Sequence, residues 1–233
     1  MEKGDTVVGT GVEIEKYSPV QIKRIYDEYL KISNNYSCAI REVKTKLEIL
    51  DNDFQLLHKH NPIHHMESRI KGIDSIIKKA KNRNIEISSE NICEEILDIA
   101  GIRVICHYIE DIYVISELLK NQTDIQLIKE KDYIKYPKPN GYRSLHLVVK
   151  IPVFFVDGVK ELPVEVQIRT IAMDFWASLE HELRYKSDGV IPKFIADELL
   201  ECANASHESD LKMQRMHNFL DELDSGKLIT NNY

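Results

Sequence analysis

The chain has 233 residues, of which 43% are hydrophobic and 30% are charged, and its formal net charge is -7. This hydrophobic content excludes an intrinsically disordered protein. The longest strongly apolar run, Ile151 to Val156, is far shorter than the roughly 20 residues that span a bilayer, and the N-terminal sequence MEKGDTVVGT lacks the apolar core of a signal peptide. We therefore expect a cytoplasmic protein with no membrane partner. The net acidity argues against a protein that coats nucleic acid.

The cysteines indicate a reducing compartment. They lie far apart in the sequence and form no C-x-x-C pair: Cys38, Cys93, Cys106 and Cys202. This distribution favours free thiols that pack as small apolar side chains, because disulfides persist in oxidising compartments.

The first half of the chain is predicted to be mainly helical. Residues 1–17 show no helical period and are expected to form a flexible tail. Ser18 and Pro19 fit a helix N-cap followed by proline at the first helical position. Apolar residues then recur every three or four positions up to Leu50, which predicts one long helix or two. Two further helices are expected, over about Met66–Arg83 and over Glu90–Leu97.

The second half of the chain alternates between strand and helix patterns. Runs rich in β-branched residues predict strands at Gly101–Tyr108, Ile125–Ile128, Leu145–Val153 and Val164–Ile168. The Asp157-Gly158 pair between apolar flanks predicts a hairpin, and two prolines with an Asn-Gly pair predict a loop over Tyr136–Tyr142. Helices are expected over Asp111–Lys120, over Ala172–Lys186, and from Pro192 to about Leu223.

These elements predict an α/β (α+β) fold. A mixed β-sheet should be flanked by helices, with helical additions at the N- and C-terminal ends. The expected organisation is a single domain over residues 18–224, between the flexible tail over 1–17 and a disordered tail over 225–233.

Residues 69–83 form a strongly basic stretch in an otherwise acidic chain, with six Lys and Arg residues and one acid. Four polar side chains should gather near the start of the predicted helix and one turn further on: Arg69, Lys71, Ser75 and Lys79. Basic groups at a helix N-terminus suit a polyphosphate, because the exposed backbone amides add their own positive field. The alternative is a solvated cationic helix face.

Two acidic residues lie at predicted strands, Asp98 just before the strand that contains Arg103 and Glu165 in the middle of the run VEVQIR. Strand alternation places Glu165, Gln167 and Arg169 on one face. An acid flanked by β-branched residues is costly to desolvate unless it is paired or binds a metal ion. Two such carboxylates on adjacent strands are suited to Mg²⁺. The alternative is that each acid forms a salt bridge with a nearby arginine.

The loop before the third predicted strand mixes aromatic and basic side chains. Its candidate binding residues are Lys135, Lys138, Asn140, Tyr142, Arg143 and His146. This mixture suits a nucleotide, because a ring stacks on the base while cations bind the phosphates. A plain surface loop has the same composition, so the loop alone does not decide.

Two other features favour structural interpretations. Four histidines, His58, His60, His64 and His65, lie close together, but no cysteine or paired acid completes a zinc pattern, so an exposed loop between helices is expected. Trp176, on the apolar face of a predicted helix with Phe175 and Leu179, is expected to lie in the core.

Four segments, in order, resemble the synthetase domain of the RelA/SpoT-type alarmone synthetases, in particular the small stand-alone members. They are RIKGIDSIIKKAKNR, DIAGIRVICHYIEDI, DYIKYPKPNGYRSLHLVV and VEVQIRTIAMDFWASLEHELRYK, and the resemblance spans about Tyr17 to Leu220. It implies a nucleotidyltransferase-like fold and a GTP pyrophosphokinase that moves the β,γ-pyrophosphate of ATP to the 3′-hydroxyl of GDP or GTP. The sequence has no His-Asp dipeptide, so no hydrolase domain is expected.

The resemblance also implies roles for individual residues. The implied ATP-binding residues are Arg69, Lys71, Ser75, Lys79 and Arg103, with Arg69 and Arg103 on either side of adenine. Asp98 and Glu165 are the implied catalytic carboxylates and Mg²⁺ ligands, with Glu165 near the acceptor hydroxyl. Tyr142 is the implied stacking partner of guanine. The other implied GDP/GTP-binding residues are Lys135, Lys138, Asn140, Arg143, His146, Gln167 and Arg169.

Two alternative functions remain open from the sequence. One is the same transfer to another acceptor, an adenosine nucleotide or a tRNA 3′ end, which the net charge of -7 disfavours for RNA. The other is a non-catalytic nucleotide or RNA sensor, which the presence of Asp98 and Glu165 disfavours. The resemblance further implies a homo-oligomer, commonly a tetramer, and the sequence departs from it at Asp174, where relatives often carry asparagine near the guanine.

Overall fold

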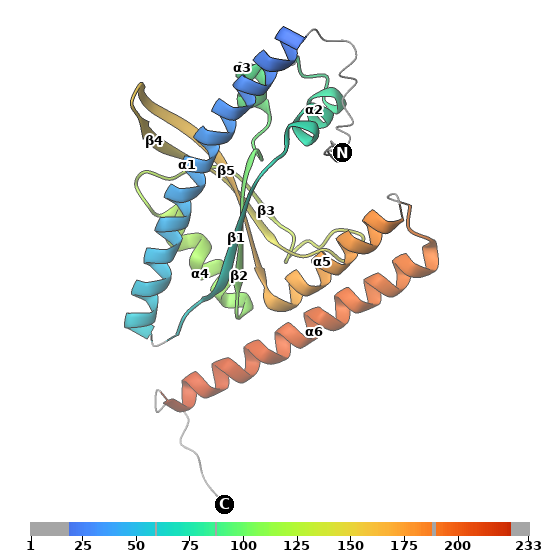
Figure 1. Cartoon of the computed structure of the whole chain (residues 1–233). Helices are drawn as coiled ribbons and strands as arrows, with labels where there is room; N and C mark the ends of the chain where they lie inside the picture. Colours follow the sequence, from blue (N-terminus) through green and yellow to red (C-terminus); the bar gives the residue numbers. More distant parts are fainter. Residues whose placement is uncertain (1–18, 59, 87, 188–189, 225–233) are drawn as a thin grey trace, which may run out of the picture.

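The computed structural model describes residues 19–58, 60–86, 88–187 and 190–224. Its described strands form one mixed sheet in the order β1-β2-β5-β4-β3 (Figure 1). Strands β2 and β5 are parallel, and the other neighbouring pairs are antiparallel. The strands are β1 (Ile63–Ile70), β2 (Ala100–Cys106), β3 (Gln126–Asp132), β4 (Leu145–Phe155) and β5 (Gly158–Thr170). The predicted mixed sheet is therefore confirmed.

Helices lie on both sides of this sheet (Figure 1). They are α1 (Pro19–His58), α2 (Ile73–Asn82), α3 (Ser89–Glu95), α4 (Ile109–Lys120), α5 (Ile171–Lys186) and α6 (Lys193–Asp224). Helices α1 and α4 cover one face, and α5 follows β5 directly and packs against α6. In the described part of the chain, no helix combines the length and the apolar character needed to cross a membrane.

The core lies between α1, α4 and one face of the sheet. Helix α1 buries Tyr36, Ile40, Val43 and Leu47, whose spacing of three and four is that of a single helix stripe. The opposing sheet residues are fully buried and alternate along their strands, as Val164, Val166 and Ile168 do on β5. These apolar contacts leave the opposite face of the sheet free to carry polar side chains.

The predicted helix over Met66–Arg83 is wrong in its first part, because residues 63–70 form strand β1. This strand lies at the edge of the sheet and pairs only with β2 among the described strands. Its polar sequence lacks the apolar alternation of a half-buried strand, which fits an edge strand. The helical spacing that suggested one long helix belongs to α2, which starts at Ile73 after the N-cap Gly72.

The predicted β3 is too short, since the strand extends over Gln126–Asp132 rather than ending at Ile128. Strand β3 is the other edge of the sheet and its residues are mostly exposed, so its polar second half carries no hydrophobic signal. The predicted hairpin at Asp157-Gly158 is confirmed, because Phe155 pairs with Gly158. The two C-terminal helices are also confirmed as α5 and α6. The proposed tails over 1–17 and 225–233, and the N-cap Ser18, lie outside the described residues.

The side chains of α5 only partly follow the sequence interpretation. Trp176 is 4% exposed and packs with Ala177 and Ala203, which confirms that it is a core residue. Phe175 and Leu179 are 60% and 44% exposed, so Trp176 is the buried member of the apolar face on which the sequence placed all three. The burial of Trp176 depends on α6, whose docking site the sequence period of α5 does not reveal.

A buried hydrogen bond joins α6 to the end of β5. Thr170 is the N-cap of α5 and accepts a hydrogen bond from Met173 N. Its hydroxyl donates to Asp210 Oδ2 over 2.6 Å. Burial raises the pKa of Asp210 to about 6, although the bond from Thr170 and the charge of Arg143 act in the opposite direction.

This raised pKa predicts a pH-dependent stabilisation by Asp210→Asn. Above the folded-state pKa of about 6, the fold bears the cost of a buried charge that asparagine lacks. The shift of about two pH units corresponds to about 3 kcal/mol at most. The variant should therefore unfold at a higher denaturant concentration than the wild type at pH 7.5, and the gap should narrow as the pH falls from about 6 to 4. A gap that is constant with pH would contradict a charged Asp210.

Candidate active site

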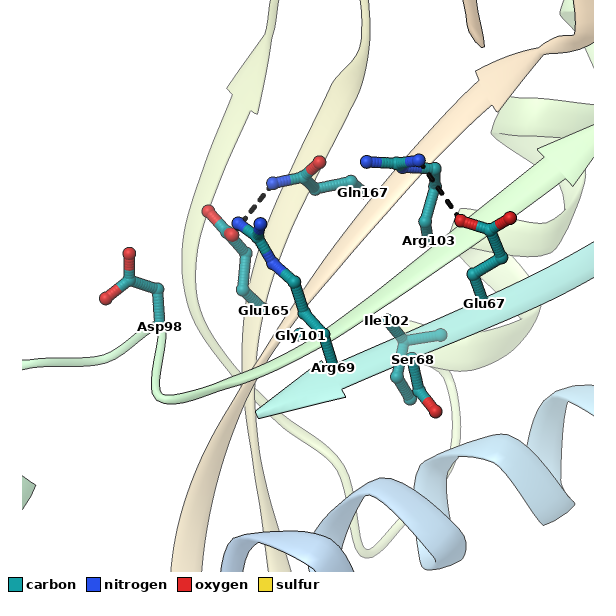
Figure 2. A pocket seen from close by; sticks show the side chains of 9 residues that line it. All are labelled: Glu67, Ser68, Arg69, Asp98, Gly101, Ile102, Arg103, Glu165 and Gln167. Atoms are coloured by element: carbon teal, nitrogen blue, oxygen red, sulfur yellow. Dashed lines mark hydrogen bonds and ion pairs between the residues drawn. The ribbon is translucent and has the colours of Figure 1, made fainter. Parts of the chain in front are cut away.

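Two pockets open on the polar side of the sheet and meet at two carboxylates. The first, here called the arginine pocket, has a volume of about 70 Å³ and is lined by Glu67, Ser68, Arg69, Asp98, Gly101, Ile102, Arg103, Glu165 and Gln167 (Figure 2). The second, here called the lysine pocket, has a volume of about 300 Å³ and is lined by Lys79, Arg83, Leu97, Asp98, Lys129, Lys131, Tyr133, Lys138, His146, Val148 and Glu165. Asp98 and Glu165 belong to both.

Strand register explains why these carboxylates lie together. Glu165 is in the middle of β5 and pairs with Gly101 on the parallel neighbour β2. Asp98 lies just before the first residue of β2. Its carboxylate points to the same side of the sheet as Glu165 (Figure 2). Gly101 brings no side chain to the space beside Glu165, so the pocket stays open between the two acids.

Asp98 is held by two lysines. Lys71 Nζ and Lys79 Nζ each lie 2.6 Å from Asp98 Oδ2. Burial opposes ionisation of Asp98, but these hydrogen bonds and the two positive charges outweigh it and lower the pKa of the carboxyl group. The other oxygen, Oδ1, is buried and has no hydrogen-bond partner within the described residues. Asp98 therefore presents a charged oxygen that is available to a cation.

Glu165 is also ionised despite its burial. Gln167 Nε2 donates to Glu165 Oε2 over 2.9 Å, and His146 Nδ1 lies 3.5 Å from Oε1. Burial raises the pKa of Glu165 and the nearby charge of Asp98 adds to that effect, but the contacts with His146 and Gln167 lower it more. The alternative, in which each acid forms a salt bridge with a nearby arginine, is wrong. Asp98 pairs with two lysines, and Glu165 contacts Gln167 and His146.

Glu165 is one member of a closed ring of side-chain contacts. Besides the contacts of Glu165, Arg169 Nη2 donates to Gln167 Oε1 over 2.8 Å and to Tyr142 Oη over 2.7 Å. Tyr142 Oη lies 2.8 Å from His146 Nε2. With its hydrogen on Nδ1, neutral His146 points a donor at the Glu165 carboxylate and accepts from the Tyr142 hydroxyl at Nε2. This tautomer satisfies every contact of the ring.

Two arginines define the smaller pocket. Arg69 on β1 and Arg103 on β2 extend into the same space from neighbouring strands (Figure 2). Arg103 Nη1 lies 3.2 Å from Glu67 Oε2 and 3.5 Å from Asp174 Oδ1. Asp174 Oδ1 also accepts from Arg169 Nη1 over 3.2 Å, so it joins the arginine pocket to the ring around Glu165. Two planar guanidinium groups that face one space are suited to a flat aromatic ligand.

Six residues that line the lysine pocket were missing from the sequence-based site: Arg83, Leu97, Lys129, Lys131, Tyr133 and Val148. Lys129 and Lys131 alternate along β3 and therefore share one face, and Tyr133 follows directly. Lys138 Nζ lies 4.7 Å from the ring centroid of Tyr133 and 4.5 Å from that of Tyr142. The alternation of Lys129 and Lys131 was a usable signal, but it required β3 to extend past residue 128. The pocket is a cationic space with aromatic walls.

Seven predicted site residues line neither pocket: Lys71, Ser75, Lys135, Asn140, Tyr142, Arg143 and Arg169. Lys71, Tyr142 and Arg169 contact residues that do line a pocket, namely Asp98, His146 and Gln167. The other four make no such side-chain contact within the described residues. Ser75 is exposed on α2, and Lys135 lies 3.6 Å from Asp132 with its ammonium 5.0 Å from the ring centroid of Tyr113. Asn140 Nδ2 donates to Glu180 on α5 over 3.3 Å. Arg143 turns towards α6. Lys135, Asn140 and Arg143 thus contact other elements, and Ser75 faces solvent.

The predicted basic helix start is corrected in the same way. Arg69 ends β1, Lys71 lies in the link before α2, and Lys79 is near the end of that helix. The cations therefore converge on Asp98 from different elements rather than from one helix terminus.

The histidine-rich segment is also corrected, since His64 and His65 are exposed residues of β1 and not of a loop. Within the described residues, no group of three or more His, Cys, Asp or Glu side chains is arranged to hold a metal ion.

Comparison with known proteins identifies related molecules. Residues 68–190 match the model of the region found in RelA/SpoT proteins. The GTP pyrophosphokinase YwaC of Bacillus subtilis (strain 168) is 44% identical over 82% of this chain and 91% of its own length. The crystal structure of small alarmone synthetase 1 from Bacillus subtilis bound to its product pppGpp aligns with a TM-score of 0.75 and 35% identity, over 82% of this chain and 96% of that one. The same enzyme bound to AMPCPP aligns with a TM-score of 0.73 and 33% identity, over 84% and 99%.

Proposed function

The chain belongs to the RelA/SpoT family and is a GTP pyrophosphokinase that makes (p)ppGpp, and on this premise we propose which of its residues carry out the reaction. The enzyme transfers the β,γ-pyrophosphate of ATP to the 3′-hydroxyl of GDP or GTP, and AMP leaves. The observation that carries the residue assignment is the meeting of two cation-lined pockets at Asp98 and Glu165. A transfer between two nucleotides needs one pocket for each, with the reacting groups where the pockets meet.

In this proposal, ATP occupies the arginine pocket. Adenine lies between the guanidinium planes of Arg69 and Arg103, which favour stacking on a flat ring. The triphosphate then passes Asp98 and reaches Lys79 and Arg83 at the border of the lysine pocket. The short ion pairs of Lys71 and Lys79 with Asp98 support this path, because they keep both ammonium groups next to the point where the phosphates must lie.

We propose that Asp98 and Glu165 would hold Mg²⁺ together with the phosphates of ATP. The residues fit the ion, because both carboxylates are ionised and Asp98 Oδ1 is buried without a partner among the described residues. Two carboxylates suffice, since Mg²⁺ completes its coordination with water and phosphate oxygens. When bound, the ion neutralises charge on the transferring phosphates. Lys71 and Lys79 add fixed positive charge beside it, which needs no reorganisation during the reaction.

The acceptor is proposed to occupy the lysine pocket and the adjacent loop. The ring of Tyr142 offers a stacking surface for guanine, and Lys138 lies beside it. Lys129 and Lys131 on β3 are suited to the 5′-phosphates. They line the same pocket as Asp98, but β5 and β4 lie between their strand and β2. This arrangement presents the 3′-hydroxyl to the carboxylates and the 5′-phosphates to β3.

Glu165 is proposed to orient the 3′-hydroxyl for in-line attack on the β-phosphorus of ATP. Its lowered pKa keeps it an ionised hydrogen-bond acceptor, and the ring of contacts from Gln167 and His146 fixes its direction. As the new oxygen–phosphorus bond forms, the hydroxyl proton passes to Glu165 or to water, the bond between the β-phosphorus and the bridging oxygen to the α-phosphate breaks, and the charge moves onto AMP. The lysines beside Asp98 stabilise the charge on the transferring group.

We propose that the chain forms a homo-oligomer, specifically a homotetramer, and acts in the cytoplasm as a single synthetase domain over residues 18–224. Exposed apolar residues support assembly: Phe175, Leu179 and Leu183 follow one face of α5, and Met213, Met216, Phe219 and Leu220 extend along α6. Exposed apolar rows of this kind on a folded protein indicate an interface. Light scattering should give about four times the mass of one chain, and Leu179→Glu should shift it to a smaller species. A wild-type monomer would contradict this proposal.

The assigned carboxylates predict the outcome of a labelled-ATP assay. With [γ-³²P]ATP and Mg²⁺, the label should appear on GDP and GTP but not on ADP or tRNA. Asp98→Asn and Glu165→Gln should each lower turnover by about 10²-fold or more, because each removes a charge that holds the ion. Glu161→Gln, on the exposed part of the same strand, is the matched control and should act like the wild type. Normal turnover by either site variant would refute its role, and label on ADP or tRNA alone would reassign the acceptor.

Two substitutions of Tyr142 separate its ring from its hydroxyl. Tyr142→Ala should raise the KM for GDP and GTP by about 10- to 100-fold, because base stacking contributes roughly 1–3 kcal/mol. Tyr142→Phe keeps the ring but breaks the bonds to Arg169 and His146, so it should leave this KM nearly unchanged and lower kcat a few-fold. Steady-state kinetics with each substrate varied is the measurement. An unchanged acceptor KM in a normally folded Tyr142→Ala enzyme would remove the ring from the site.

A further inference from the structure

We infer that Arg143 is a positioning residue for the acceptor, which fastens the loop that carries Tyr142 onto helix α6 and so sets the angle of the tyrosine ring. The inference rests on the proposed function of Tyr142 as the guanine-stacking residue. It differs from a direct contact between Arg143 and the nucleotide, which the sequence suggested. The evidence is the way in which the loop and the helix touch.

The backbone of the loop lies directly against α6 at Gly141. A Cβ atom added at this position would be 2.5 Å from Ala203 Cβ and 3.1 Å from Leu200 Cδ1. Gly141 also has a φ of 88°, in the region that favours glycine. Because Gly141 has no side chain and Ala203 has a small one, the loop backbone can pack directly against α6 at this point.

Arg143 closes this seating with hydrogen bonds on both sides of the contact. Its Nη1 donates to Gly141 O over 3.1 Å and to Ala203 O over 3.4 Å, and its Nη2 donates to Asn204 Oδ1 over 3.3 Å. One guanidinium group therefore bridges the loop backbone, the helix backbone and a helix side chain. Both terminal nitrogens of Arg143 are engaged at this contact, so its charge serves the joint rather than a phosphate.

Helix α6 is itself fixed to the rest of the molecule, so it is a rigid support for the loop. Trp176 Nε1 donates to Leu199 O over 2.7 Å, just before the segment that Gly141 touches. Asp210 accepts from Thr170 at the end of β5. Further along, Gln214 Oε1 accepts from the backbone of Glu110 over 2.9 Å at the start of α4. These three bonds tie three points along α6 to α5, to the sheet and to α4.

Tyr142 lies between the two residues that form the joint. Its ring packs against the small cluster of Trp176, Ala177 and Ala203, and its hydroxyl accepts from Arg169. The ring is thus held at its base by the joint with α6 and at its tip by the sheet. Loss of Arg143 frees the base of the ring, and stacking of guanine weakens while the ATP pocket keeps its geometry.

Kinetics with separated substrates test this role. Arg143→Ala should raise the KM for GDP and GTP about 10-fold and by the same factor, with the KM for ATP changed less than about 2-fold. A direct contact with the γ-phosphate would instead raise the KM for GTP more than that for GDP, and a general structural role would raise the KM for ATP as well. A direct contact with a phosphate that GDP and GTP share is separated by the double-mutant cycle below. Arg143→Lys should fall between the wild type and Arg143→Ala. Arg215→Ala, an exposed arginine on the same helix, is the matched control and should leave both KM values unchanged.

A double-mutant cycle with Tyr142→Ala decides whether Arg143 acts through the ring. In the Tyr142→Ala background, Arg143→Ala should raise the acceptor KM less than about 2-fold further, because the ring it positions is gone. Full additivity of the two effects would overturn the inference. If Arg143→Ala does not fold, Ala203→Val and Asn204→Ala decide in its place. A rise confined to the acceptor KM supports the joint, and an equal rise in both KM values refutes it. A wild-type enzyme that transfers no pyrophosphate would refute the proposed function itself, which is a separate outcome.

Discussion

The structure depends on keeping a charged carboxylate in the middle of a central strand. Glu165 has strands on both sides and a fully buried apolar row on the opposite face of β5. An isolated charge in such a place is expensive. The contacts of Gln167 and His146 reduce this cost, and they in turn need Arg169 and Tyr142 to hold them. The polar side of the sheet is therefore built around Glu165. Each side chain of the ring is held by a contact with the next one.

Asp98 follows the same logic with a different solution. Its carboxylate lies at the end of β2 and not within it, so two long lysine side chains can reach it from the link before α2 and from α2 itself. Both ammonium groups bind the same oxygen. The second oxygen remains buried and unpaired within the described residues. On the proposed Mg²⁺ assignment this asymmetry is useful, because the lysines balance the charge of Asp98 and leave its second oxygen for the ion.

The sequence predicts the interior of this fold better than its edges. Strands β2, β4 and β5 are buried on at least one face, and their β-branched residues mark them clearly. Strands β1 and β3 lie at the edges, where polar residues are suitable and no apolar alternation forms, so the first was taken for a helix and the second was cut short. Some of their polar residues also line the pockets. The residues that remove the apolar alternation typical of a strand are therefore residues that form the site.

For the site, motif and resemblance identify the residues but not the directions of their side chains. Asp98, Glu165, Lys79, Arg69, Arg103 and His146 all reach the two pockets as the sequence suggests. Arg143 does not, although it directly follows Tyr142. Its direction depends on α6, which begins about 50 residues later in the chain. A contact of that sequence separation leaves no local pattern, and the same reason explains why Lys129 and Lys131 are found only once β3 is placed beside β4.

The seating of Gly141 on Ala203 also orders the assembly of the enzyme in time. Gly141 precedes β4, Ala203 lies in α6, and every strand of the described sheet precedes α6 in the chain. Because synthesis runs from the N-terminus, both carboxylates and the residues of the arginine pocket leave the ribosome before α6 does. A chain without α6 would keep these residues but leave the loop of Tyr142 without its support. On the proposed assignment of Tyr142, alignment of the acceptor therefore depends on the last of the described helices to be made.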